Sequence, residues 1–228
     1  MKRSNFLNTL ALLALAAVLP ARVFSINLIK STSNNIDEAL IALRILIKDL
    51  RTEGSYIVRK TLNGKRYKRN ESVHYPYEDS VEDTQTHCQV FFHAHRKNEY
   101  GHFHTFIDNE KGELVHLIMI TMDKQGNPTS LSTLNRWVTG DTFEDSNKLK
   151  QLLPKFSISA SLFPDKRIIE FINHIFTAYQ PQIFHLFEER DEYITNYVSQ
   201  NANEPFEDRQ VEVLSSFKIQ QLTDGTLS

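Results

Sequence analysis

The sequence predicts an α+β fold, in which an antiparallel sheet at about residues 55–139 packs against an N-terminal helix and C-terminal helices. Three observations support this prediction. Apolar residues recur at helical spacing between Ile36 and Leu50, and again after Asp165. Between residues 86 and 139, β-branched and aromatic runs are separated by short turn signals, which is typical of a meander of about four antiparallel strands.

The N-terminal residues 1–25 have the pattern of a secretory signal peptide. Lys2 and Arg3 give a positive start, and a short apolar core follows at residues 10–19. That core is too short to cross a bilayer, for which about 20 apolar residues are needed. We therefore expect a periplasmic or secreted protein, with an N-terminal amphipathic helix retained in the fold as the alternative.

Composition limits the remaining functional classes. The formal net charge is −2, and removing the signal segment, which holds three basic and no acidic residues, would leave −5. This mild acidity argues against a nucleic-acid partner. No later segment is long and apolar enough to predict a transmembrane helix. The single cysteine, Cys88, cannot form an intrachain disulfide, so we expect a small buried apolar residue.

One domain is expected over residues 26–200, followed by a tail at 201–228 that ends as a strand or loose segment. Its first helix should begin at a capping Asn34 or Asn35 and end near Glu53. Two further helices are predicted after residue 165, at 165–178 and 182–198, with a break at Pro181 between them.

Residues 55–70 are expected to form a β-hairpin that turns at Asn63-Gly64, because this dipeptide is the strongest short hairpin signal. Six basic side chains make this segment cationic. An anionic partner would explain them, and so would an edge strand that lysine and arginine keep from pairing. The basic residues are Arg59, Lys60, Lys65, Arg66, Lys68 and Arg69.

Five of the nine histidines lie within residues 87–106. They include two His-x-His pairs separated by six residues that are rich in turn formers and charge. The flanking residues are apolar, aromatic or β-branched, so we interpret the segment as a second β-hairpin. The two pairs are His93 with His95 and His102 with His104.

Alternate side chains of a strand share a face, so each histidine pair should point to one side of the sheet. With a turn centred on residues 98 and 99, His95 would lie opposite His102 and His93 opposite His104, with Cβ atoms about 5 Å apart. Neutral imidazole is a common ligand of transition metals, so the sequence predicts a divalent metal site for zinc, copper or iron. The alternative is that these are packed or solvent-facing strand histidines. A one-residue register slip would separate the pairs.

Further candidate residues surround this site. Glu99 can reach in from the turn, and Arg136 with Trp137 has the chemistry of a pocket for an anionic or ring-bearing ligand. Glu99 and Arg136 are the candidate catalytic residues. Trp137 would otherwise close the core and Arg136 would pair with an acid. His116 is expected to be a packed residue that shares a face with Leu114 and Ile118, with a fifth metal ligand as the alternative.

The motif His93-x-His95 followed by Glu99 is similar to the central part of the cupin pattern. The glycines of that pattern would fall on His87 and Phe106, and its second block has no counterpart here. The similarity therefore implies only that the paired histidines resemble a metal-binding arrangement.

A second resemblance covers about residues 35–195. The blocks HAHRKNEYGHFHTF, HLIMITMDKQGNP and NRWVTG resemble a family of uncharacterised bacterial proteins that is defined by a domain of unknown function. This resemblance implies that the histidine segment and NRWVTG belong to one domain. It implies no activity, because the family has none assigned.

Three functions are consistent with the sequence. The first is an exported metalloenzyme acting on a small molecule, hydrolytic with zinc and oxidative with iron or copper, in which three ligands leave one position for water. The second is a metal-binding protein without turnover, in which four histidines close the site. The third is a ligand-binding module whose histidines recognise an acidic or pH-dependent partner.

Overall fold

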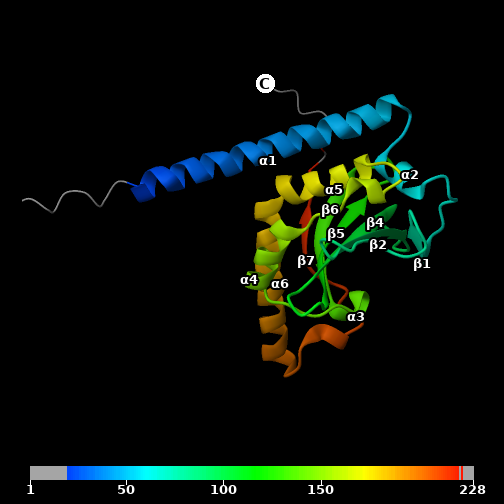
Figure 1. Cartoon of the computed structure of the whole chain (residues 1–228). Coiled ribbons are helices and arrows are strands. Elements are labelled where there is room, and N and C mark those ends of the chain that lie inside the picture. Colours follow the sequence, from blue (N-terminus) through cyan, green and yellow to red (C-terminus); the bar gives the residue numbers. More distant parts are fainter. Residues whose placement is uncertain (1–19, 221, 223–228) are drawn as a thin grey trace, which may run out of the picture.

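The computed structural model describes residues 20–220 and residue 222, and it confirms the predicted α+β class. A seven-stranded antiparallel sheet carries helices on one face (Figure 1). The strands are β1 (Asn70–Tyr75), β2 (Val81–Asp83), β3 (Cys88–Ala94), β4 (Gly101–Asp108), β5 (Leu114–Met122), β6 (Pro128–Leu134) and β7 (Val213–Lys218). The α-helices are α1 (Pro20–Thr52), α2 (Ile57–Leu62), α3 (Arg136–Thr139), α4 (Ser146–Leu152), α5 (Arg167–Ala178) and α6 (Gln180–Asn201).

The sheet is built around the predicted meander. Its strand order is β1-β3-β4-β5-β6-β7, and β2 also pairs with β3. The four consecutive strands β3 to β6 confirm the meander expected between residues 86 and 139. At the far edge, β7 pairs with β6 and brings residues 213–218 into the sheet.

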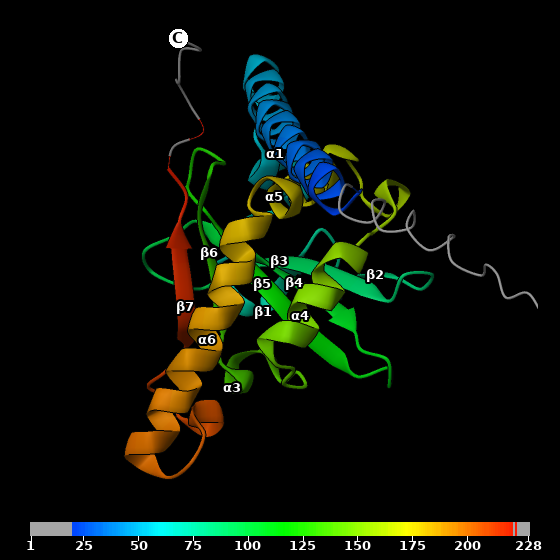
Figure 2. The same ribbon diagram turned by 90° about the vertical axis from the view of Figure 1, so that its left-hand side faces the viewer.

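The two faces of the sheet differ in what covers them. Helix α6 packs on β6 and β7, and α1 packs on α5, so the three long helices α1, α5 and α6 lie on the same side of the sheet (Figure 1 and Figure 2). Phe92, Phe103 and Ile120 point toward the helices and are fully buried in the core. Cys88 joins the same core at 0% exposure, on the face opposite His93, which confirms the buried apolar residue expected from the sequence. The histidines therefore occupy the face that the helices leave uncovered.

Helix α1 begins earlier than predicted. It runs without interruption through Asn34 and Asn35, so neither residue caps its start, whereas its end at Thr52 agrees with the sequence. Residues 1–19 of the expected signal peptide lie outside the described residues, and residues 20–25 belong to the first turns of α1. Among the described helices none has the length and hydropathy of a membrane span.

The predicted hairpin at residues 55–70 was wrong, because residues 57–62 form helix α2. Ile57, Val58 and Leu62 are buried, which is helical spacing rather than strand alternation. Asn63 and Gly64 have φ angles of 47° and 77° and end this helix. Both a helix C-terminus and a two-residue hairpin use positive φ, so Asn-Gly could not distinguish them.

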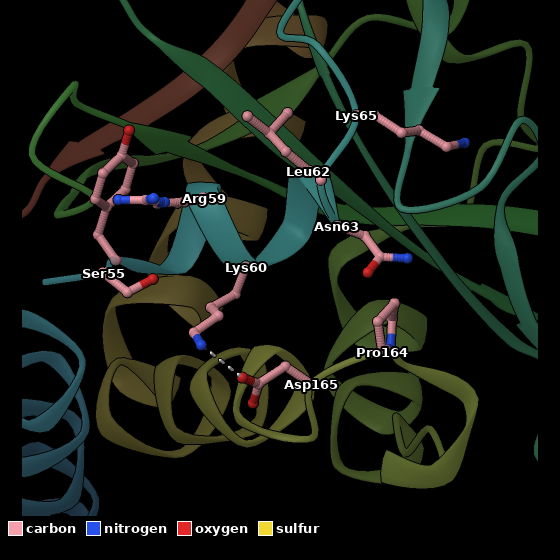
Figure 3. Close-up of a pocket in the computed structure, with 10 residues that line it drawn as sticks. Ser55, Arg59, Lys60, Leu62, Asn63, Lys65, Pro164 and Asp165 are labelled. Atoms are coloured by element: carbon pink, nitrogen blue, oxygen red, sulfur yellow. Dashed lines mark ion pairs between the residues drawn. The ribbon is translucent and has the colours of Figure 1, made fainter. Parts of the chain in front are cut away.

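A cavity of about 590 Å³ adjoins α2. Several of the basic residues that were predicted to lie on the hairpin line this cavity (Figure 3). Lys60 Nζ lies 3.6 Å from a carboxylate oxygen of Asp165 and 3.7 Å from one of Glu53. Arg59 donates a hydrogen bond to the carbonyl oxygen of Gly54 at 3.1 Å. These contacts tie α2 to its neighbours and give two of the cations a structural role.

The strand predicted to continue to residue 139 instead ends at Leu134, where NRWVTG forms helix α3. The side chain of Asn135 accepts a hydrogen bond from the backbone N–H of Arg136 at 2.9 Å, and Gly140, with φ 65°, ends the turn. Asn135 is fully buried and also donates to the carbonyl oxygens of Pro205 at 2.7 Å and Val211 at 2.9 Å. This asparagine anchors the chain that leads into β7.

Candidate metal centre

His93, His102 and His104 lie on strands at the uncovered face of the sheet, and His95 follows directly after β3. The register pairs His93 with His102 and Phe91 with His104, two residues away from the predicted pairing. The hairpin connection is therefore centred one residue earlier than expected. A shift of two residues leaves every side chain on its original face, so the predicted cluster is preserved.

The rings of His93, His95 and His102 form the compact part of this cluster. Ring centroids are 4.8 Å apart for His93 and His95, 4.5 Å for His93 and His102, and 5.1 Å for His95 and His102. One ligand nitrogen from each of the three lies within 4.8 Å of the others. Two nitrogens bound to one tetrahedral zinc are about 3.3 Å apart, so small side-chain rotations would suffice to share an ion.

Hydrogen bonds orient two of these rings. His93 Nδ1 lies 2.9 Å from the carbonyl oxygen of Glu71, which can only accept, so this nitrogen carries the proton. His102 Nδ1 contacts the Glu99 carboxylate, and its Nε2 is buried without a hydrogen-bond partner in the described chain. Both rings therefore present an unprotonated Nε2 to the cluster. The carboxylate–histidine contact is the outer-shell arrangement common around metal ligands.

Burial keeps three of these histidines, His93, His102 and His104, uncharged. Desolvation, helped by neighbouring imidazoles, lowers the pKa of His93 to about 3 and holds the pKa of His102 and His104 well below 6.5. The same desolvation raises the pKa of Glu99. Neutral imidazole is the form that binds a metal ion. These three rings are therefore in their ligating form at neutral pH.

His104 lies beside the group of three. Its Nε2 is 3.1 Å from Nε2 of His93, and its Nδ1 is 3.2 Å from Nε2 of His116. Without an ion, His104 donates to His93 and accepts from His116. The 3.1 Å spacing is also close to that of two nitrogens on one ion, so His104 is the fourth possible ligand.

His116 contacts the cluster because of a β-bulge that sequence alternation did not reveal. His104 pairs with Met119 and Phe106 pairs with His116, so Leu117 and Ile118 together oppose one residue of β4. This irregularity turns His116 to the histidine face, away from the face of Ile118 where alternation had placed it. The buried side chain lies 5.3 Å from the His104 ring, centroid to centroid.

Of the other candidate residues, Glu99 contacts the histidines, Trp137 lines the pocket beside them, and Arg136 does neither. Glu99 joins the cluster through His102, and its side chain is only 6% exposed. Arg136 is 47% exposed and pairs with Glu207 at 2.8 Å, so it does not line the pocket beside the histidines. Trp137 does line that pocket, with its Nε1 donating to the carbonyl oxygen of Val211 at 2.7 Å.

A cavity of about 740 Å³ opens beside the histidines and is called the aromatic pocket here. Its walls include Phe91, Phe106 and Trp137, and His93 and His95 form the side nearest the cluster. Phe91 and Phe106 stack at 5.8 Å. Sequence reasoning missed the two phenylalanines as pocket residues, although their spacing from the histidines by two and four residues places them on the same strand face.

The fold and this geometry define an α+β domain that carries a buried histidine cluster on the open face of its sheet. The chain belongs to the family described as Domain of unknown function (DUF6969), whose model matches residues 38–219. This agrees with the resemblance to an uncharacterised family noted in the sequence. Searches among curated proteins and among solved structures gave no match.

Proposed function

We propose that this protein binds a divalent transition metal through His93, His95 and His102, and that His104 is the candidate fourth ligand whose coordination separates the two roles described below. One observation carries the proposal: the buried Nε2 of His102 lacks a hydrogen-bond partner in the described chain and lies beside two other ring nitrogens. A buried polar atom without a partner costs about 1–3 kcal/mol, which a bound ion would offset. Imidazole nitrogens bind zinc, copper and iron alike, so the proposal names the class of ion, a divalent transition metal, and not one element.

The preferred role is that of a metalloenzyme. Three histidine ligands leave one coordination position for water, and His93 and His95 line the aromatic pocket through which a small substrate would enter. A zinc ion in such a site lowers the pKa of its bound water to about 7 and supports hydrolysis at neutral pH. Glu99 would act as a positioning residue that holds the His102 ring rather than as a group that touches substrate.

A metal-handling protein without turnover is the second candidate. The 3.1 Å spacing between Nε2 of His93 and Nε2 of His104 favours it, because four histidine ligands close the coordination sphere. Export through the N-terminal signal sequence is part of both proposals, and a shortened N-terminus on protein recovered from the periplasm or medium would support it.

Metal content of purified protein tests the proposal. After dialysis against zinc, elemental analysis should find about one ion per parent chain and little in His95→Ala or His102→Ala. His185→Ala is the matched control, because His185 is exposed on α6 beside Glu188 and Glu189. Metal bound equally well by His95→Ala and the parent would refute the site.

The two roles are separated by the coordination sphere of the ion. Cobalt-loaded protein titrated with azide should change its visible spectrum if a water position is open. An unchanged spectrum in the parent, together with azide binding in His104→Ala, would show that His104 closes the site and would favour metal handling.

A further inference from the structure

A second cavity, of about 630 Å³, lies on the other side of His95 and is called the hydroxyl pocket here. Its lining differs from that of the aromatic pocket, because it is formed mainly by hydroxyl and cationic side chains. His95 and Glu212 line both cavities, so the two adjoin at the histidine cluster. The hydroxyl and cationic residues are Thr121, Thr129, Ser130, Ser132, Ser216, Arg96, Lys97 and Lys218.

One straight row of residues joins this pocket to the metal centre. In the register of the sheet, His93 pairs with His102, His102 with Thr121, Thr121 with Ser130, and Ser130 with Lys218. These five residues lie on five neighbouring strands and share the uncovered face. Strands are spaced about 4.8 Å apart, so Ser130 lies roughly 10 Å from His102 along the row.

Within residues 20–220, the hydroxyls of Thr121 and Ser130 in this row have no hydrogen-bond partner, and both residues line the pocket. Thr129 already donates to the carbonyl oxygen of Thr121 at 3.2 Å, and Ser132 bonds to Ser216 at 3.0 Å. Thr121 and Ser130 lie next to these bonded residues, and their side chains line the pocket. A hydroxyl is a neutral donor that bonds well to phosphoryl or carboxylate oxygens.

Three cationic and two acidic side chains line this pocket. Arg96 lies between two carboxylates, 3.7 Å from Glu99 and 3.3 Å from Glu212, and is already paired. Lys97 and Lys218 have no carboxylate partner in the part of the chain that the structure describes, and both line the hydroxyl pocket. Two unpaired lysines beside a row of hydroxyls match an anion better than an apolar or cationic group.

We propose that the hydroxyl pocket binds an anionic group, phosphoryl or carboxylate, of the molecule whose reacting part lies at the histidine cluster. The inference rests on the proposed function for its link to the metal, but anion binding itself needs only the row and the two lysines. The substrate would then be elongated, because its anionic group would lie about two strand spacings, or roughly 10 Å, from His102. A ring or apolar group would occupy the aromatic pocket on the opposite side.

The test uses inorganic phosphate as the probe and the full-length protein. An NMR titration, run on metal-free and on zinc-loaded protein, should shift the amide signals of Thr121, Ser130 and Lys218 in both forms. A Lys97→Glu and Lys218→Glu double variant should bind phosphate at least tenfold more weakly. Lys218→Gln alone should weaken it less and serves if the double variant does not fold.

Lys111→Glu is the charge-matched control, because Lys111 is exposed in the turn at the other end of the β4–β5 hairpin. Equal weakening by Lys111→Glu, or no shift at the three amides, would overturn the proposal and leave Lys218 as a solvated edge lysine. Phosphate binding in a protein that holds no zinc would instead support the subsite while contradicting the proposed metal function.

Discussion

The carboxylate of Glu99 accepts a hydrogen bond from Nδ1 of His102, three residues later in the chain. This contact fixes the proton on Nδ1 and turns Nε2 toward His93 and His95. Glu99 therefore controls the ring orientation on which the proposed metal site depends.

Removing that carboxylate should weaken metal binding while the fold remains. Glu99→Ala is expected to reduce zinc affinity about 10–100-fold, because His102 loses its orienting partner. Glu99→Gln should reduce it less, since its amide oxygen still accepts from Nδ1. Competition with a chromophoric chelator measures the affinity. The control is Glu110→Gln, which removes only a surface pair with Lys148, and a similar loss there would contradict the role of Glu99.

Gly101 begins β4 at the place where the hairpin connection meets the core. Its φ is +143°, and a Cβ atom would lie 2.3 Å from Cζ of Phe92 and 2.8 Å from the carbonyl oxygen of His93. Gly101→Ala should therefore lower the free energy of unfolding by at least about 2 kcal/mol through overpacking beside the cluster. Urea denaturation measures this loss.

The comparison for Gly101 is Gly112 in the next turn, with φ +73° and open space around its Cβ position. Gly112→Ala carries only the cost of a left-handed backbone, about 1 kcal/mol. Equal stability losses in the two variants would show that close contact with Phe92 is unimportant.

Thr105 holds the β-bulge that brings His116 to the cluster. Its hydroxyl donates to the carbonyl oxygen of Ile118 at 2.8 Å and accepts from the N–H of the same residue at 3.2 Å. Thr105→Val keeps the shape but leaves two buried backbone groups without a partner, at a cost of about 1–3 kcal/mol. Thr177→Val, on the exposed side of α5, should change stability by less than about 0.5 kcal/mol.

The buried histidines should make the metal-free protein sensitive to acid. Burial lowers the pKa of His93 to about 3 and of His116 to about 4, from an ordinary value of 6.5. Below pH 6.5 these histidines are protonated in the unfolded chain but remain neutral in the folded chain. The free energy of unfolding therefore falls as the pH falls. The loss develops between pH 6.5 and about 4 and reaches about 3 kcal/mol for His116.

Denaturation of metal-free protein at several pH values would measure this slope. His116→Gln cannot titrate and should reduce the slope between pH 6.5 and 4. A slope that His116→Gln does not alter would assign the acid sensitivity to other groups.

Local sequence patterns accounted for much of the fold. Helical spacing placed α5 and the end of α1, and β-branched and aromatic runs between turn signals placed β3 to β6. The errors arose where one local signal suits two structures. Asn63-Gly64 ends helix α2 rather than turning a hairpin, and the Asn34-Asn35 pair lies within α1. In both places the structure depends on which side chains are buried by distant parts of the chain, and a short stretch of sequence does not carry that information.

By itself, the sequence determined that His93, His102 and His104 share one face of a hairpin, because strand alternation has a period of two and tolerates a two-residue shift in register. The tertiary structure alone decided the rest of the site. The register that pairs His93 with His102, the bulge at Ile118 and the carbonyl of Glu71 beside His93 all depend on contacts between strands. Such contacts are selected by the packing of the whole sheet against its helices, so no local pattern could specify them.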